Sequence, residues 1–364
     1  MSAEQQPQVG LVGLGNIGRH HAAQLQELDA ALVGGLDIAP AARERFESEF
    51  DAQAYEDAAA LYDAVDAVIV TTPNRFHEEY AVGALEAGLD VLLEKPLAHS
   101  LESAERIADA AEDADGFCMV GFSNRFSNVV EVLTEYIREG RLGEVTHIEA
   151  NYVRRRGVPG RGSWFTTKDV SGGGSLIDLG VHAIDLALHF LDYPEVVEVS
   201  GVTRSQFGGR DDYAFVEMWG EDAGPEGFDV DDSTSAFIRC ADGRSISLEV
   251  AWAANRPTTH EFFIRGTEGG ARFDRKAQEL TLLDAEKGST DRLIDSDIET
   301  SESNMHRAEQ AVFLEAVSDG VHPGCNTVEE GVTVQRVIDA IYRSSENDRT
   351  VAVTESTPPI PGGD

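Results

Sequence analysis

The feature that most constrains the fold is a glycine-rich turn placed directly between a short apolar segment and a helix. Residues 9–12 form the apolar segment, and Gly13, Gly15 and Gly18 follow it in the pattern G-x-G-x-x-G. The first glycine permits a tight bend, and the second lets the backbone approach a pyrophosphate. The third lets the helix pack closely on the strand, with its N-terminus facing the phosphates. The turn therefore predicts a dinucleotide-binding site.

The residues around this turn indicate which dinucleotide binds. Asn16 and Ile17 lie inside the motif, at the start of the helix. Asp37 ends the second predicted strand, 19 residues after Gly18, where a carboxylate can accept hydrogen bonds from ribose hydroxyls and repels a 2′-phosphate. The next basic residue, Arg43, lies a turn or more into the following helix. We expect NAD as the cofactor, with NADP as the alternative if Arg43 reaches a 2′-phosphate.

Short apolar segments alternate with amphipathic helical segments over the first 120 residues. The predicted strands are residues 9–12, 31–36, 67–70, 90–93 and 117–120. The predicted helices between them are residues 16–28, 41–50, 76–87 and 101–114. This alternation is typical of a parallel sheet covered by helices on both faces. We therefore predict a doubly wound α/β domain, residues 1–123, that binds a nucleotide.

The pattern changes after Gly121 to strands in series with flanking helices. The predicted elements include strands at residues 145–153, 234–239 and 245–251 and helices at residues 128–139, 304–318 and 328–344. Such a series predicts an α+β domain, residues 124–364, on a largely antiparallel sheet. We expect the acidic stretch at residues 221–232 to be a solvated loop and the tail at residues 354–364 to be frayed.

The charge of the chain limits its partners. Sixty-six acidic and 29 basic residues leave a net charge of −37, which opposes binding to nucleic acids and anionic membrane surfaces. The lysines are Lys95, Lys168, Lys276 and Lys287, and the other basic residues are arginines. A surface rich in Asp and Glu with so little lysine resembles proteins of salt-loving microbes, in which salt screens self-repulsion. We expect a halophilic source; an acidic protein of ordinary habitat is the alternative.

Other features of the composition indicate the compartment. The chain has no run of about 18 apolar residues that could cross a membrane. Residues 1–7 lack the basic start and apolar stretch of a signal peptide. Cys118, Cys240 and Cys325 are odd in number and lack the spacing of a metal site or disulfide framework. We expect a cytoplasmic protein without a metal.

Glu94, Lys95 and Pro96 follow the predicted strand at residues 90–93 and form the second motif. They lie on the edge of the sheet where ligands bind in doubly wound folds. Lysine is rare in this chain, and its pKa can be moved by burial into a range useful for catalysis. Pro96 excludes helical geometry from Lys95 and permits a cis peptide bond. A solvated lysine at the end of a strand is the alternative.

The third motif is a glycine-rich loop, residues 172–174, followed by a helix that carries Asp178, His182 and Asp185. Their spacing places carboxylate, imidazole and carboxylate on one helix face. A histidine held by an acid suits removal of a hydroxyl proton, although an ordinary polar helix face is the alternative. His189 extends this stripe, but no further ligand has a recognisable spacing, so we expect no metal site.

Taken together, the motifs resemble the glucose–fructose oxidoreductase / inositol dehydrogenase (Gfo/Idh/MocA) family over residues 8–274. The motifs are the glycine turn, Thr71-Thr72-Pro73-Asn74 with His77, Glu94-Lys95-Pro96, and the glycine-rich loop that leads into Asp178 and His182. The resemblance implies an N-terminal Rossmann domain and a C-terminal domain with an open sheet. It also implies a homodimer or homotetramer that forms through that sheet.

The resemblance implies roles for individual residues. Lys95 and His182 would be the catalytic pair, supported by Asp178. The cofactor cleft would be lined by Thr72, Pro73, Asn74 and His77, with Glu94 near the nicotinamide. In this scheme His182 accepts the proton of a ring hydroxyl, the carbon beneath gives hydride to the nicotinamide, and Lys95 donates a hydrogen bond to the oxygen.

The substrate is less constrained by the sequence. Trp164 follows a glycine-rich turn and could stack against a sugar ring, or it could simply pack in a loop. Arg125 begins the second domain beside the cleft. Residues 154–156 are a rare basic run that could hold a phosphate or carboxylate of the substrate, although pairing with the acidic surface is the alternative. Because a strand alternates its sides, at most Arg154 and Arg156 point the same way.

The function expected from this set is an NAD(P)-dependent dehydrogenase of a sugar, a sugar derivative or a cyclic polyol. A glycoside hydrolase that oxidises, eliminates and re-reduces its substrate with tightly held NAD is one alternative with the same fold. A non-catalytic regulator that binds the cofactor is another, because a fold alone does not determine function.

Overall fold

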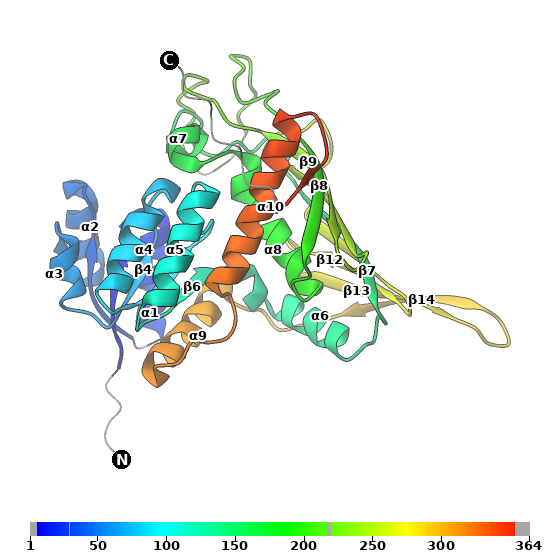
Figure 1. Cartoon of the computed structure of the whole chain (residues 1–364), viewed down its shortest axis with the longest axis horizontal. Coiled ribbons are helices and arrows are strands. Elements are labelled where there is room, and N and C mark those ends of the chain that lie inside the picture. Colours follow the sequence, from blue (N-terminus) through cyan, green and yellow to red (C-terminus); the bar gives the residue numbers. More distant parts are fainter. Residues whose placement is uncertain (1–5, 29, 217, 219, 354–364) are drawn as a thin grey trace.

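The computed structural model of the chain describes residues 6–28, 30–216, 218 and 220–353, and its N-terminal part contains a parallel sheet (Figure 1). The six strands have the order β3-β2-β1-β4-β5-β6. They are β1 (Gln8–Val12), β2 (Ala31–Leu36), β3 (Gln53–Tyr55), β4 (Ala67–Val70), β5 (Asp90–Glu94) and β6 (Cys118–Gly121). The predicted doubly wound domain is confirmed. Among these six strands, only the short edge strand β3, which lacks an apolar run, is not indicated by the sequence pattern.

Helices cover both faces of this sheet. They are α1 (Asn16–Glu27), α2 (Pro40–Phe50), α3 (Ala58–Tyr62), α4 (His77–Glu86) and α5 (Leu101–Asp113). The start of α5 illustrates how local sequence sets a helix end, because the Ser100 hydroxyl accepts a hydrogen bond from the backbone N–H of Ser103. The apolar side of α5, with Ala104 and Ile107, is buried against the sheet.

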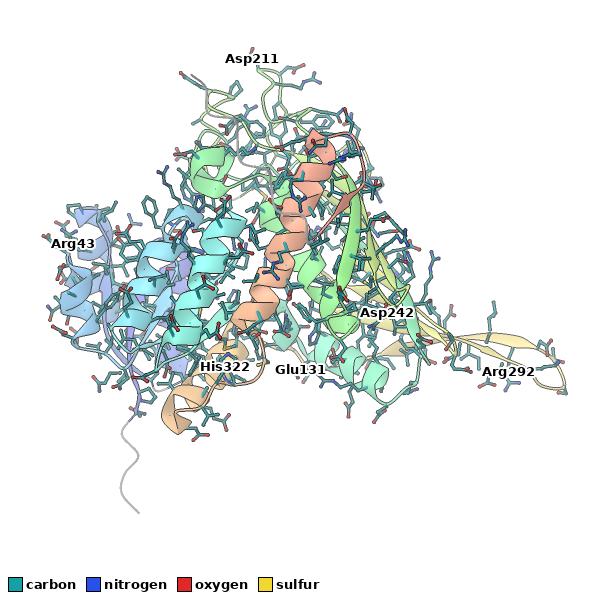
Figure 2. All side chains as sticks on the ribbon, in the orientation of Figure 1. Arg43, Glu131, Asp211, Asp242, Arg292 and His322 are labelled. Atoms are coloured by element: carbon teal, nitrogen blue, oxygen red, sulfur yellow. The ribbon has the colours of Figure 1, made fainter. Side chains whose placement is uncertain are left out.

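The rest of the chain is built on a second sheet of nine strands, in the order β14-β13-β12-β11-β7-β10-β9-β8-β15. The strands are β7 (Val145–Val153), β8 (Val196–Arg204), β9 (Ser233–Cys240), β10 (Ser245–Ala251), β11 (Glu261–Gly266), β12 (Gly270–Asp274), β13 (Glu279–Glu286), β14 (Arg292–Ile298) and β15 (Val351–Ala352). Neighbours are antiparallel except β7 and β10, so the predicted largely antiparallel sheet is confirmed. The hairpin of β13 and β14 projects from the body, and Arg292 lies on it (Figure 2).

One face of the second sheet packs against helices. They are α6 (Asn128–Arg138), α8 (Val181–Phe190) and α10 (Val328–Glu346). The short α7 (Lys168–Ser171) does not cover the sheet and lies near the first domain (Figure 1). Side chains of β7 alternate between the two faces of the sheet. Ile148 and Ala150 are buried on the face that the helices cover. His147 and Glu149 instead line a shallow trough of about 670 Å³ on the opposite face. None of the helices in the described ranges is long and apolar enough to cross a membrane.

The last two helices connect the domains. Helix α9 (Met305–Asp319) packs against α1, and its Phe313 is fully buried in the same core cluster as Leu25. Helix α10 packs against α5 and β8, and Figure 1 shows it running between the two sheets. Helices near the end of the sequence therefore pack against the parallel-sheet domain and stabilise it.

The acidic stretch at residues 221–232 is not solvated throughout, contrary to the prediction. Asp231 and Asp232 at its end are buried. The Asp232 carboxylate accepts hydrogen bonds from three backbone N–H groups, those of Gln206, Phe207 and Gly208. All three donors reach Oδ2, while Oδ1 is buried without a partner; burial raises the pKa of Asp232, and the three N–H groups oppose that rise. The tail at residues 354–364 lies outside the described residues.

Candidate active site

A cleft of about 960 Å³ lies at the carboxyl edge of the parallel sheet and extends to the second sheet. It brings together most of the residues that the sequence singles out. Those that line it are Gly13, Gly15, Asn16, Ile17, Asp37, Thr72, Pro73, Asn74, His77, Glu94, Lys95, Trp164, Asp178 and His182. Gly18 and Arg125 are not among the residues that line the cleft. Gly18 packs against the carbonyl oxygen of Gly13.

The glycine turn has the geometry of a phosphate cradle. Gly13 has φ of +96°, and a Cβ on Gly18 would lie 2.0 Å from the Gly13 carbonyl oxygen. A Cβ on Gly15 would meet nothing within 4 Å, so the turn is open toward the cleft. The hydroxyl oxygen of Thr72 is buried without a hydrogen-bond partner. An open turn at a helix start and an unpartnered hydroxyl fit a dinucleotide.

Asp37 and Arg43 bear on the choice between NAD and NADP. The Asp37 carboxylate accepts hydrogen bonds from the backbone N–H groups of Leu14 and Ala39, both at 2.8 Å. Arg43 donates to the carbonyl oxygens of Asp37 at 2.8 Å and of Ile38 at 3.2 Å, and its guanidinium also pairs with Glu56. Figure 2 places Arg43 on the first domain. Because the guanidinium is already engaged, this arrangement favours NAD.

Two side chains that follow β4, those of Asn74 and His77, form hydrogen bonds with neighbouring segments of the cleft. The ring nitrogens of His77 face the carbonyl oxygens of Pro96 and Thr72, both at 2.9 Å. Burial lowers the pKa of His77, although the two carbonyls favour its charged form. Asn74 donates a hydrogen bond to the carbonyl of Ser171 at 2.7 Å, which connects the first domain to the glycine-rich loop of the second.

Glu94 is held by a buried chain of hydrogen bonds. Its carboxylate lies 2.9 Å from Nε2 of His21, and it accepts the backbone N–H of Lys95 at 3.1 Å. Nδ1 of His21 lies 2.5 Å from the amide nitrogen of Gln310 in α9. Burial opposes ionisation of Glu94, but the hydrogen bond from His21 and the charges of His21, His306 and Lys95 outweigh it and lower the pKa to about 2. Glu94 is therefore a carboxylate at neutral pH.

Lys95 and Asp178 form a contact between the domains inside the cleft. Nζ of Lys95 lies 3.4 Å from Oδ1 of Asp178, and the Lys95–Pro96 peptide bond is cis. The indole N–H of Trp252 donates to Oδ2 of Asp178 at 2.8 Å, and a guanidinium nitrogen of Arg154 lies 4.0 Å from the same oxygen. Burial raises the pKa of Asp178, but Lys95, Arg154 and Trp252 outweigh it, and the net shift is downward.

His182 is oriented by two residues. Arg275 donates to the amide oxygen of Asn124 at 3.0 Å, and the amide nitrogen of Asn124 lies 2.7 Å from Nδ1 of His182. Because a guanidinium can only donate, Arg275 fixes the amide so that its amino group donates to Nδ1. Burial and the charges of Lys95 and Arg275 lower the pKa of His182 well below its ordinary value. The ring is therefore neutral, and its proton is on Nε2. The sequence predicts a proton acceptor here, whereas this arrangement presents a donor.

Asp185 and Arg125 belong to a separate buried network. The guanidinium of Arg125 donates to Asp185 at 2.6 Å and to Glu330 at 2.8 Å, and it also bonds the Tyr193 hydroxyl. All of these groups lie inside the second domain. The structure therefore does not place Arg125 among the cleft residues, because three partners already take its donors, and Asp185 does not join Asp178 and His182. The segment Leu176–Gly180 is a π-helical turn, so the regular spacing assumed from the sequence is not kept.

A buried aspartate holds the glycine-rich loop. The Asp231 carboxylate accepts the backbone N–H groups of Gly174 and Leu176, both at 2.9 Å, and the hydroxyl of Tyr342 in α10 at 2.7 Å. A Cβ on Gly174 would lie 1.8 Å from the backbone oxygen of Asp231, so any side chain at this position would push the loop away. This contact sets the start of the segment that carries Asp178.

The aromatic and basic residues at the substrate end show the predicted alternation. Trp164 lines the cleft and packs against Phe165, with ring centroids 4.1 Å apart. Arg154 and Arg156, just after the end of β7, are half-buried, whereas Arg155 is exposed. Arg156 donates to two backbone carbonyls and an asparagine side chain, so it is not paired with the acidic surface.

Comparison with protein families identifies this arrangement. A model described as "Oxidoreductase family, NAD-binding Rossmann fold" matches residues 8–122. A second model, the GFO/IDH/MocA C-terminal domain, matches residues 130–272. The chain belongs to the Gfo/Idh/MocA family. The resemblance inferred from the motifs is thereby confirmed.

Known Gfo/Idh/MocA proteins resemble this member over nearly their whole length. D-glucoside 3-dehydrogenase of Escherichia coli is 30% identical over 89% of this chain and 90% of that protein. D-xylose 1-dehydrogenase (NADP(+)) 2 of Haloferax volcanii is 28% identical over 94% of this chain and 98% of that protein. A solved structure of levoglucosan dehydrogenase, in complex with NADH and levoglucosan, has a TM-score of 0.81 at 25% identity and covers 96% of this chain and 100% of that chain.

Several residues of this site are not indicated by any local motif. They are His21, Trp252, Arg275 and Gln310, and Asn124 is indicated only by its place at the start of the second domain. Each reaches the site from an element distant in sequence, so only the sheet pairing and helix packing reveal it. For Arg154, the sequence signal is its place in the basic run at residues 154–156.

We expect Glu94 to stabilise the fold in a pH-dependent way. Because the pKa of Glu94 falls from 4.5 to about 2 on folding, its contribution is present above about pH 5 and is lost as the pH falls toward 2. The free energy of unfolding of the wild type should therefore exceed that of Glu94→Gln by less at pH 3 than at pH 6. Denaturant titrations at each pH measure this difference. Glu139→Gln, at an exposed position, provides the baseline, and an equal difference at both pH values would contradict the prediction.

Proposed function

We propose that this protein is a dehydrogenase that uses NAD to oxidise a hydroxyl group of a sugar, a sugar derivative or a cyclic polyol. One observation carries the proposal: Lys95, Asp178 and His182 lie in the same cleft as an open glycine turn. The names of the relatives support the substrate class, since they are dehydrogenases of a glucoside, of xylose and of levoglucosan.

We assign the two parts of the reaction to the two domains. Residues 1–123 bind the cofactor, through the glycine turn, Asp37 and the loop that contains Thr72, Pro73, Asn74 and His77. Residues 124–364 supply most of the substrate side of the cleft, including Trp164, which presents a half-buried aromatic face on which a sugar ring can stack. When bound, the nicotinamide cofactor accepts the hydride from the substrate carbon. NADP is the alternative cofactor, but Asp37 and the engaged Arg43 oppose a 2′-phosphate.

The residues of the chain then have the following roles. His182 donates a hydrogen bond from Nε2 to the substrate oxygen and so fixes its position. After the Lys95 ammonium has released a proton to solvent, its amine accepts the hydroxyl proton, and the restored ammonium group lies beside the Asp178 carboxylate at 3.4 Å. Asp178, whose pKa is lowered by Lys95, Arg154 and Trp252 against the effect of burial, stabilises this charge. In the reverse direction Lys95 returns the proton while His182 polarises the carbonyl.

An assay of nicotinamide reduction tests the function. Absorbance of the reduced nicotinamide should rise when the protein is mixed with NAD and one group of aldoses, inositols, sugar acids or sugar phosphates, and it should rise less with NADP. A hydrolase that oxidises, eliminates and re-reduces its substrate would release its sugar product without net formation of reduced nicotinamide. Binding of NAD without any turnover would instead favour a regulator, and either result would contradict the proposal.

Two substitutions separate the roles of the catalytic pair. Lys95→Met removes the proton acceptor and should lower kcat by about a thousandfold or more. His182→Asn keeps an N–H donor but cannot act as a base, so kcat should fall by only about ten- to a hundredfold. Cofactor binding, measured by fluorescence titration with NADH, should be retained in both variants. Equal losses of kcat in the two variants would show that His182 is the proton acceptor.

The charge of the chain supports two further proposals. We propose that the source is halophilic, on the basis of the net charge of −37, the scarcity of lysine and the similarity to a Haloferax protein. We also propose a cytoplasmic location, because Cys118, Cys240 and Cys325 are free thiols and a reducing compartment keeps them so.

Stability in salt tests the halophilic origin. Because salt screens repulsion between surface carboxylates, the Tm should rise by at least about 10 °C between about 0.1 M and 2 M KCl. Differential scanning fluorimetry measures the change. A Tm that is independent of KCl would indicate an acidic protein of ordinary habitat.

The open face of the second sheet supports a proposed oligomer. We propose that two or four copies associate through this face, where the trough of about 670 Å³ lies. Phe237 and Val202, on the paired strands β9 and β8, line this trough and are 43% and 50% exposed; exposed apolar side chains that gather in one patch mark contact surfaces.

A further inference from the structure

Cationic side chains gather at the substrate end of the cleft, in a chain whose net charge is −37. Lys95 and Arg275 line the cleft, and Arg154 lies next to Asp178. Asp178 is shared, because both Lys95 and Arg154 approach it. The positive charge here therefore exceeds what this carboxylate can balance.

Arg275 makes no ion pair with any carboxylate in the described part of the chain. Its terminal nitrogens donate to the Asn124 amide oxygen and to the Tyr152 hydroxyl, which are both uncharged. Its Nε is buried without a partner. Asp274, the preceding residue, accepts the backbone N–H groups of Lys276 and Ala277 at 2.9 Å and so faces its own turn. A half-buried guanidinium with a free donor is costly unless a ligand pairs with it.

Arg154 and His260 extend this cluster around the ring of Tyr152. The guanidinium carbons of Arg275 and Arg154 lie 4.2 Å and 5.6 Å from the ring centroid. His260 packs against the same ring at 4.6 Å, and both of its ring nitrogens are buried without partners. Burial, Arg275 and Arg154 lower the pKa of His260 to about 4, so the ring is neutral and adds no positive charge, but it has a hydrogen-bond donor to offer.

We propose that Arg275 and Arg154 form an anion subsite, and that the substrate is a sugar or polyol that carries a phosphate or carboxylate group. This inference rests on the proposed function. Arg275 is separated from His182 only by Asn124, so the anionic group lies close to the reacting hydroxyl. Guanidinium groups pair with phosphate and carboxylate oxygens through charge-assisted hydrogen bonds, and no carboxylate in the described part of the chain takes this role for Arg275.

Matched substrates test the subsite. We would measure kcat/KM for glucose, glucose 6-phosphate and glucuronate, and for inositol and an inositol phosphate, with NAD at constant KCl. For at least one pair, the anionic member should be preferred over its neutral parent by about tenfold or more. The phosphate and carboxylate arms distinguish the two anionic groups. A neutral parent that is used as well as its anionic forms would overturn the subsite while leaving the dehydrogenase intact.

Variants separate recognition from positioning. Arg275→Gln and Arg154→Gln should each reduce the preference for the anionic substrate by about tenfold, and Arg275→Lys should restore part of it. Arg155→Gln is the matched control, because Arg155 lies in the same run but is exposed, and it should leave the preference unchanged. If Arg275→Gln instead lowers kcat equally for neutral and anionic substrates, Arg275 only positions Asn124, and the subsite is overturned.

Binding provides a readout that does not depend on turnover. Calorimetric titration of the NADH-loaded protein with glucose 6-phosphate, glucuronate and glucose should show tighter binding of an anionic sugar, weakened in Arg275→Gln. Such binding without any reduction of NAD would support the subsite and contradict the dehydrogenase. Absence of binding by the anionic sugars, in a protein that does oxidise a neutral one, would contradict the subsite alone.

Discussion

The ion pair of Lys95 with Asp178 is the contact on which the cleft depends, because its two members come from different domains. Lys95 follows β5 at the carboxyl edge of the parallel sheet, whereas Asp178 lies in the π-helical turn before α8. Bringing a carboxylate into such a buried position is unfavourable unless its oxygens find several partners. Trp252 and Arg154 supply them, so the second sheet stabilises the charge that the first domain approaches.

Helices near the end of the chain support both members of this pair. Gln310 in α9 contacts His21, which in turn holds the carboxylate of Glu94 next to Lys95. Tyr342 in α10 donates to Asp231, whose carboxylate holds the start of the segment that carries Asp178. The relative position of the two catalytic segments is therefore set by packing of residues more than a hundred positions away. A displacement of either helix would change the Lys95–Asp178 distance.

The sequence predicts the fold well because the fold depends on periodic patterns. Most strands and helices of both domains follow from the spacing of apolar residues, and Lys95 and His182 follow from compact local motifs. Arg125 and Asp185 show the limit of such patterns, because spacing along a helix does not tell which partner a carboxylate meets. The buried Asp231 shows another limit, since a run of acidic residues looks solvated until the backbone N–H groups that need an acceptor are placed around it.

The distribution of charge has a consequence for the approach of a substrate. An anionic sugar would be repelled at long range by a surface with a net charge of −37. In molar salt the Debye length is about 3 Å, so that repulsion does not extend into the solvent around the cleft. Direct contacts with Arg154 and Arg275 occur at shorter distances, partly shielded from solvent, and are screened much less. The salt that would make the acidic surface tolerable would therefore also allow an anionic substrate to reach the cationic end of the cleft.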